Sequence, residues 1–187
     1  HIIGQIYFLH QPLDKNLLIV KNLDAPNGVN IGLTDSIPLE IIFIKLLHPL
    51  FPNIHQGLSI FLALCWFLQP ICAVFALRAM GEKRFLPNIA VAVFAACMPT
   101  YLNRIGHTAL CAHWILLLAL GFYFRSVKYR ENIFYVVLSS ILTVSTLLIH
   151  PYLLVMVLAI QFSFPLGEFL KNKNSKNNFF YFLPIFI

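Results

Sequence analysis

Apolar residues fall into long runs separated by short polar segments, and this spacing predicts membrane-spanning helices. The complete runs cover residues 58–77, 85–103, 107–124, 133–149 and 152–167. At about 1.5 Å per residue, the longest would extend about 30 Å, the thickness of a bilayer's hydrocarbon core. The continuous run 114–120 lacks the alternation of a β-barrel strand. We therefore predict an all-α, polytopic membrane protein with about five complete spans.

A sixth apolar run begins near Phe179 and is too short to span before the chain ends at Ile187. The chain also opens at His1 rather than at a methionine. We therefore expect a fragment with elements missing at both ends and a truncated sixth span. Residues 1–56 are expected to form a polar loop with one helix, and residues 57–187 an incomplete transmembrane bundle.

Composition agrees with the membrane assignment. Hydrophobic residues make up 59% of the chain and charged residues 11%, whereas soluble domains carry about 25% charged residues. The net charge of +6 does not indicate nucleic acid, because the basic residues stand between apolar runs without interleaved aromatic residues. We expect membrane lipid as a partner and no nucleic acid. The four cysteines lie within apolar runs without zinc-ligand spacing, so they are interpreted as small buried hydrophobic residues.

The connections between the runs differ in charge, and this predicts orientation. Nine basic residues occupy alternate connections: Arg78, Lys83, Arg84, Arg125, Lys128, Arg130, Lys171, Lys173 and Lys176. The intervening turns hold only Arg104 among lysines and arginines. Because cytoplasmic loops collect Lys and Arg, the nine residues are expected inside. Residues 1–56 would then be extracytoplasmic, on the same side as Arg104.

The predicted outer segment contains a short helix. Turn signals occupy residues 26–32, and the triplet 34–36, Thr-Asp-Ser, offers N-cap side chains. Pro38 suits the first turn, and the His48-Pro49 pair ends the helix. We expect a helix over residues 37–47, lying in the membrane interface or between the spans and the headgroups.

Three acidic residues in this segment are candidates for chemistry. Asp35 is interpreted as an N-cap, as a general base, or as both, since a capping carboxylate is ionised and fixed in direction. Asp24, in a loop, is either a solvated acid or a second candidate base. Glu40, with Lys45, is read chiefly as surface charge and also as a candidate substrate contact.

Arg104, His107 and His113 form the second group of candidates. Arg104 and His107 stand at the outer end of two spans, either as interfacial side chains or as a phosphate site. On a continuous helix, His113 would lie about 120° from His107, so a histidine pair binding metal is not expected. His113 is either a helix-contact residue or a functional group within a span.

Prolines at positions 70, 99 and 165 predict kinks, which can line a transport path. No acidic residue occurs inside a complete predicted span, which weakens the interpretation as an ion-coupled transporter.

Three segments carry a resemblance to known proteins: residues 27–39 (Asn-Gly-Val-Asn-Ile-Gly-Leu-Thr-Asp-Ser-Ile-Pro-Leu), 45–52 (Lys-Leu-Leu-His-Pro-Leu-Phe-Pro) and 104–114, with its His-x5-His-Trp run. They resemble an uncharacterised family of bacterial polytopic proteins that is itself similar to the GT-C glycosyltransferases. The resemblance covers about residues 1–130. It implies a catalytic first extracytoplasmic loop with an acidic base and a polyprenyl-phosphate-linked sugar donor. It also implies a bacterial inner-membrane location.

The resulting hypothesis is sugar transfer from a lipid carrier to an acceptor outside the membrane. Asp35 first, or Asp24 second, would deprotonate the acceptor hydroxyl, while Arg104 and His107 stabilise the leaving phosphate. The loop lacks the paired acidic signature of many GT-C enzymes, and ligand spacing does not indicate a divalent cation, so cofactor use stays open. A transporter or flippase, and a non-catalytic assembly subunit, are the alternative hypotheses.

Overall fold

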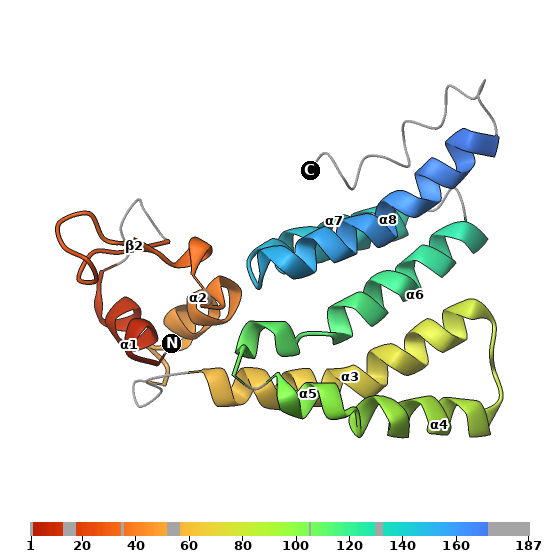
Figure 1. Cartoon of the computed structure of the whole chain (residues 1–187), viewed down its shortest axis with the longest axis horizontal. Helices are drawn as coiled ribbons and strands as arrows, with labels where there is room; N and C mark the ends of the chain where they lie inside the picture. The colour runs from red at the N-terminus through yellow and green to blue at the C-terminus, as the bar shows by residue number, and fades with distance from the viewer. Residues whose placement is uncertain are drawn as a thin grey trace.

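The computed structural model describes residues 2–12, 18–34, 36–51, 57–104, 106–129 and 133–171, and this part of the chain is mostly helical. It forms a small N-terminal unit beside a helical bundle (Figure 1). The N-terminal unit contains α1 (Ile2–His10), β1 (Ile19–Val20), β2 (Val29–Asn30), the 3₁₀ helix η1 (Ile31–Leu33) and α2 (Pro38–Leu47). The bundle contains α3 (Leu58–Met80), α4 (Phe85–Ala96), α5 (Pro99–Asn103), the 3₁₀ helix η2 (Thr108–Cys111), α6 (Trp114–Lys128), α7 (Ile133–Leu147) and α8 (Pro151–Lys171).

The N-terminal unit has its own apolar core of Phe8, Val20, Ile31 and Ile41. The antiparallel pairing of β1 with β2 was not predicted, because two residues per strand are too few to show alternation. The helix expected over 37–47 is confirmed as α2.

The start of α2 differs from the prediction. Its N-cap is Ile37, which provides no capping side chain. The hydroxyls of Thr34 and Ser36 instead donate to the carbonyl oxygen of Ile31, at 3.0 and 2.8 Å. Thr34 and Ser36 therefore stabilise the end of η1 and do not cap α2. Serine and threonine hydroxyls can bond to backbone groups that precede them as well as to those that follow. Asp35 lies outside the described residues.

In the bundle, α3 packs against both α4 and α6, and α6 also packs against α7 and α8. Small residues allow α3 and α6 to approach closely. Ala73 and Ala76 are buried, and a Cβ added to Gly121 would lie 2.3 Å from the Phe75 ring. Small residues at a helix contact are typical of packing within membranes, where close van der Waals contact replaces the hydrophobic effect.

Successive long helices alternate in direction (Figure 1). The turn between α3 and α4 and the end of α6 lie at one end of the bundle. The N-terminal unit, α5, η2 and the turn between α7 and α8 lie at the other. A backbone hydrogen bond from Leu39 N to Leu148 O (2.8 Å) joins α2 to that second end.

The bundle exposes apolar side chains and buries polar ones. One exposed face of α7 consists of large apolar residues spaced three or four apart: Phe134, Val137, Ile141, Val144 and Leu147. On the opposite side, Thr146 is fully buried and donates to Leu142 O at 2.6 Å. Thr143 donates to Gln161 Oε1 at 2.8 Å, which joins α7 to α8. An exposed surface of large apolar side chains is compatible with contact to lipid or to another apolar surface.

Within the described residues, α3, with 23 residues, is the one helix long and apolar enough to cross a membrane. This helix contains the predicted run 58–77 and continues through Pro70 without a break. The other apolar helical stretches are shorter: Phe85–Tyr101, which includes α4 and most of α5, Phe134–Leu147 and Pro151–Ser163. Five complete spans are therefore not confirmed, and the expected sixth lies outside the described residues.

Two predicted runs are interrupted. The run 85–103 divides into α4 and α5 before Pro99, because proline lacks an N–H and disfavours helical geometry in the preceding residue. The kink expected there is confirmed. The run 107–124 starts as η2, and α6 begins only at Trp114. By contrast, α8 continues through Pro165.

Candidate functional site

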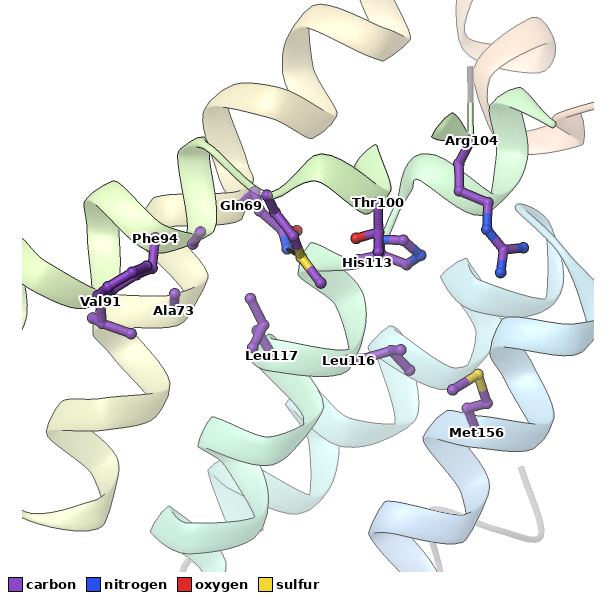
Figure 2. Close-up of a pocket in the computed structure, with 12 residues that line it drawn as sticks. Gln69, Ala73, Val91, Phe94, Thr100, Arg104, His113, Leu116, Leu117 and Met156 are labelled. Atoms are coloured by element: carbon purple, nitrogen blue, oxygen red, sulfur yellow. Dashed lines mark hydrogen bonds between the residues drawn. The ribbon is translucent and has the colours of Figure 1, made fainter. Parts of the chain in front are cut away.

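A cavity of about 600 Å³ lies among α3, α4, α5, α6 and α8. Its polar lining consists of Gln69, Thr100, Arg104 and His113. Its apolar lining consists of Ala73, Val91, Phe94, Ala95, Met98, Leu116, Leu117 and Met156. Figure 2 shows Thr100, Arg104 and His113 gathered on one side of this space and Val91, Phe94 and Leu117 on another. The cavity is therefore amphipathic.

The break at Pro99 positions Arg104. It sets α5 apart from α4, and Tyr101 on α5 is buried and donates from its hydroxyl to the carbonyl oxygen of Leu62 on α3. The chain then turns, with Arg104 N donating to Tyr101 O at 3.1 Å. The Arg104 side chain is exposed and extends toward the region between α6 and Met156 of α8 (Figure 2).

His113 approaches the same region as the N-cap residue of α6. Its backbone N–H donates to Cys111 O at 2.9 Å, which fixes the turn from η2 into α6. The ring Nδ1 is buried and has no hydrogen-bond partner within the described residues. Arg104 acts electrostatically on this ring. A buried imidazole nitrogen without a partner is available to a ligand.

Gln69 supplies a further polar group from within α3. Its side chain is buried, its Nε2 lies 3.9 Å from the Met98 sulfur, and its Oε1 has no partner within the described residues. Burying an amide oxygen without a hydrogen bond is unfavourable. Gln69 therefore offers an acceptor to a ligand that enters the cavity.

The polar lining suits an anionic group. The Arg104 guanidinium offers planar paired donors that match phosphate oxygens. Thr100 adds a hydroxyl, and His113 adds a ring nitrogen. The apolar residues from α4, α6 and α8 would contact an attached hydrocarbon chain. The arrangement can hold a phosphate that carries a lipid tail.

The structure brings Arg104 together with His113 and leaves His107 outside the cavity lining. His107 is exposed and precedes η2, and its backbone N–H donates to Arg104 O at 2.8 Å. The predicted separation of about 120° between His107 and His113 assumed a continuous helix. It does not apply, because residues 107–113 do not form one α-helix. Thr100 and Gln69 were missed. The proline before Thr100, and the Gln-Pro pair inside an apolar run, were the signals for them.

Of the two candidate bases, Asp24 lies away from the cavity (Figure 1). Asp24 is exposed in the connection between β1 and β2, with φ of 56°. Figure 1 shows this hairpin beyond α2, away from the bundle. For Asp35, outside the described residues, the predicted role is neither supported nor opposed by the geometry.

Glu40 and Lys45 are not surface charges, and this corrects the sequence interpretation. Lys45 Nζ donates to Phe8 O and Gln11 O, each at 2.6 Å, and burial lowers its pKa. Gln5 Nε2 donates to Glu40 Oε2 at 2.6 Å. Burial raises the pKa of Glu40 to about 7, although the bond from Gln5 acts in the opposite direction. Both residues turn inward because α1 covers the polar side of α2, a contact that periodicity within α2 cannot reveal.

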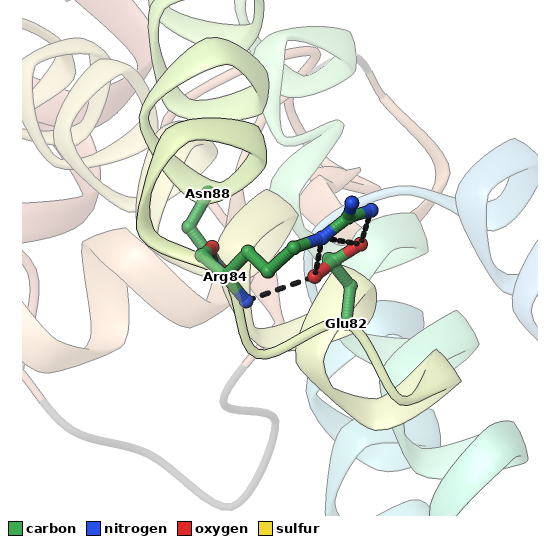
Figure 3. A network of polar contacts seen from close by, with 3 residues as sticks. All are labelled: Glu82, Arg84 and Asn88. Carbon is green, nitrogen blue, oxygen red and sulfur yellow. Dashed lines mark hydrogen bonds and ion pairs between the residues drawn. The ribbon is translucent and has the colours of Figure 1, made fainter.

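At the opposite end of the bundle, Glu82 and Arg84 order the turn before α4 (Figure 3). Arg84 donates to Glu82 from its backbone N–H (2.8 Å) and from its guanidinium Nη2 (2.6 Å). These bonds lower the pKa of Glu82 to about 2. Asn88 Nδ2 donates to the carbonyl oxygen of Arg84. This network shapes a basic turn and does not line the cavity.

No group of three or more His, Cys, Asp or Glu side chains within the described residues is arranged to hold a metal ion. The sequence matches the family described as "Domain of unknown function (DUF6311)" over residues 1–187. The chain belongs to this DUF6311 family. No curated protein and no solved structure matches this DUF6311 chain.

Proposed function

We propose that this DUF6311 protein is a polytopic, GT-C-like glycosyltransferase of the bacterial inner membrane. It would transfer a sugar from a polyprenyl-phosphate carrier to an acceptor on the extracytoplasmic face. The observation that carries the proposal is the amphipathic cavity, which combines Arg104 and His113 with an apolar wall from α3, α4, α6 and α8.

The exterior of the bundle supports the membrane location. Apolar faces on α3, α4, α7 and α8 would contact lipid, and lipid solvates such faces without the cost they incur in water. Arg78, Arg84 and Lys128 lie on the elements that meet at one end of the bundle, which fits a cytoplasmic end. The N-terminal unit and α5 then belong to the extracytoplasmic end.

The exposed side of α2 supports an interfacial position. Phe43 and Leu46 are 61% and 62% exposed, while Glu40 and Lys45 turn toward α1. The helix therefore presents apolar side chains outward and keeps its charges inside. A helix with an apolar outer face is stable at the boundary between lipid headgroups and acyl chains.

In the proposed reaction, Arg104 binds the phosphate of the donor and stabilises the negative charge that grows on it as the sugar leaves. His113 adds a ring nitrogen on the same side of the cavity, and His107 remains a candidate from outside the cavity lining. The acceptor hydroxyl loses its proton to a carboxylate, Asp35 first and Asp24 second, while its oxygen attacks the anomeric carbon.

The test is transfer of a tritiated sugar from a polyprenyl-phosphate donor in membranes that contain the full chain. We expect transfer with the wild type, a loss of at least about 100-fold for Asp35→Asn, and weaker donor use for Arg104→Lys. Arg84→Lys, at the other end, is the matched control. Full transfer by the Asp35, Asp24 and Arg104 variants would overturn the proposal. Movement of the labelled lipid between leaflets without sugar transfer would favour a flippase instead.

A further inference from the structure

A group of basic and aromatic side chains lies at the end of the bundle opposite to Arg104. The last turn of α6 holds Arg125 and Lys128, and the last turn of α3 holds Arg78. These two helices pack along each other, and their C-terminal ends lie at the same end of the bundle (Figure 1). The group does not line the Arg104 cavity and has no role in the proposed sugar transfer.

Arg125 is held against α3 by an aromatic ring. Its guanidinium carbon lies 6.0 Å from the centroid of the Phe75 ring, a distance at which a cation is attracted to the ring face. The same ring packs edge-on against Phe122, with centroids 5.7 Å apart. Arg78 stands three residues after Phe75, so it neighbours this ring on the surface of α3. The ring therefore brings basic residues of two helices together.

These cations lack negatively charged partners. Among the residues that the structure describes, the side chains of Arg78, Arg125 and Lys128 form no ion pair and no hydrogen bond, and Nε of Arg125 is buried without a partner. The carboxylate of the adjoining turn, Glu82, is bonded to Arg84. The partial charges at the C-terminal ends of α3 and α6 offset about one positive charge in total. Most of the positive charge therefore remains for an external anion.

The neighbouring side chains suit the boundary of a bilayer. Tyr129 stacks on Tyr135 with ring centroids 6.0 Å apart, and Lys128 Nζ lies 5.5 Å from the centroid of the Tyr129 ring. Tyrosine rings are enriched where lipid headgroups meet acyl chains, and basic residues collect at the cytoplasmic side. Met80 of α3 and Val127 of α6 are exposed in the same last turns. They would contact the acyl chains of a lipid.

An anionic phospholipid fits these features best. Its phosphodiester oxygens match the planar donors of Arg125, and its net negative charge matches the unpaired cations. A zwitterionic lipid would bring an ammonium group to a site without a free carboxylate. A nucleic acid would gain the same charge pairing, but Met80 and Val127 would offer no partner to its sugars or base edges.

We propose that the C-terminal ends of α3 and α6 bind the headgroup of an anionic glycerophospholipid, with Arg125 on its phosphate and Arg78 and Lys128 beside it. Basic pockets between transmembrane helices at the cytoplasmic side bind headgroups of this kind. The inference rests on the proposed membrane location and orientation. It does not depend on sugar transfer, because the two sites lie at opposite ends of the bundle.

The test is native mass spectrometry of the full chain, released from nanodiscs with equal amounts of phosphatidylglycerol and phosphatidylcholine of the same acyl chains. We expect the wild type to retain phosphatidylglycerol about tenfold more than phosphatidylcholine. Arg125→Gln should remove most of this preference, and Lys128→Gln should reduce it about fivefold. Arg84→Gln is the matched control: it removes one charge from the same end but should keep the preference, because Arg84 is bonded to Glu82.

Lys128 is exposed, so Lys128→Gln decides the matter if Arg125→Gln fails to fold. Arg104→Gln should keep the preference for phosphatidylglycerol even where it abolishes sugar transfer, so the two proposals can fail separately. Equal retention of the two lipids by the wild type, or an unchanged preference in folded Arg125→Gln, would overturn the proposal. Displacement of phosphatidylglycerol by millimolar glycerol phosphate or by a single-stranded oligonucleotide would also overturn it.

Discussion

The side chain of Gln5 donates from Nε2 to Oε2 of Glu40 at 2.6 Å, across 35 positions of sequence. The same amide accepts a hydrogen bond through Oε1 from Gly57 N at 3.3 Å. One buried glutamine on α1 therefore contacts α2 and the residue that precedes α3. This contact couples the charge state of Glu40 to the way the N-terminal unit packs on the bundle.

The first prediction concerns pH. Burial raises the pKa of folded Glu40 from 4.5 to about 7, so between these values the folded state binds more protons than the unfolded state. Its contribution to stability is then fully present below pH 4.5 and is lost as pH rises through 7. We expect the thermal midpoint of the purified wild type to fall between pH 5 and pH 8.

Glu40→Gln should reduce this fall, because glutamine does not titrate. Glu82→Gln is the matched control, since the pKa of Glu82 is lowered to about 2 and its titration lies below the tested range. A Glu40→Gln protein with the same pH dependence as the wild type would show that Glu40 has an ordinary pKa.

The second prediction concerns the space at Gly57. An added Cβ would lie 1.7 Å from Glu40 Oε1 and 1.8 Å from Ile44 Cδ1, so Gly57→Ala must displace a buried carboxyl group. We expect a loss of about 1–3 kcal/mol in the free energy of unfolding, measured by denaturant titration. Gly106→Ala is the matched control, because its Cβ would meet nothing within 4 Å. Equal effects of the two substitutions would contradict the close approach of α2 to α3.

The third prediction concerns orientation. Single cysteines at Asn27 and Asn103 should react with an impermeant maleimide from outside intact cells, in a background without the four native cysteines. Cysteines at Lys83 and Lys128 should react only after the membrane is opened. All four positions are exposed, so burial does not decide the result. Labelling at position 83 without labelling at position 27 would reverse the proposed orientation.

The sequence predicted the elements better than their ends. The apolar run containing α3 and the break at Pro99 depend on local composition and on proline chemistry, which a sequence displays directly. The late start of α6 could not be read in this way, because residues 108–112 continue the apolar run without a proline or glycine to mark a break. Only the backbone shows that they form η2 and a turn.

The candidate site was predictable in part. Arg104 stood out as the one lysine or arginine in the turns between predicted spans at its end of the bundle, and the structure places it in a cavity lining. Its association with His113 depends on the turn after η2. The inward position of Glu40 depends on Gln5, whose contact is set by how α1 packs on α2. Contacts between distant residues leave no periodic signal in a single sequence.

The most direct test of the central claim is binding of polyprenyl monophosphate by the full chain, compared with polyprenol of the same length by native mass spectrometry. The account predicts that the wild type retains the phosphate and binds polyprenol at least about tenfold more weakly, since a bond between charged groups contributes about 1.5–3 kcal/mol. Arg104→Gln should remove this difference, and Arg84→Gln should preserve it. Equal binding of the two lipids by the wild type, or an unchanged preference in Arg104→Gln, would contradict a phosphate site at Arg104.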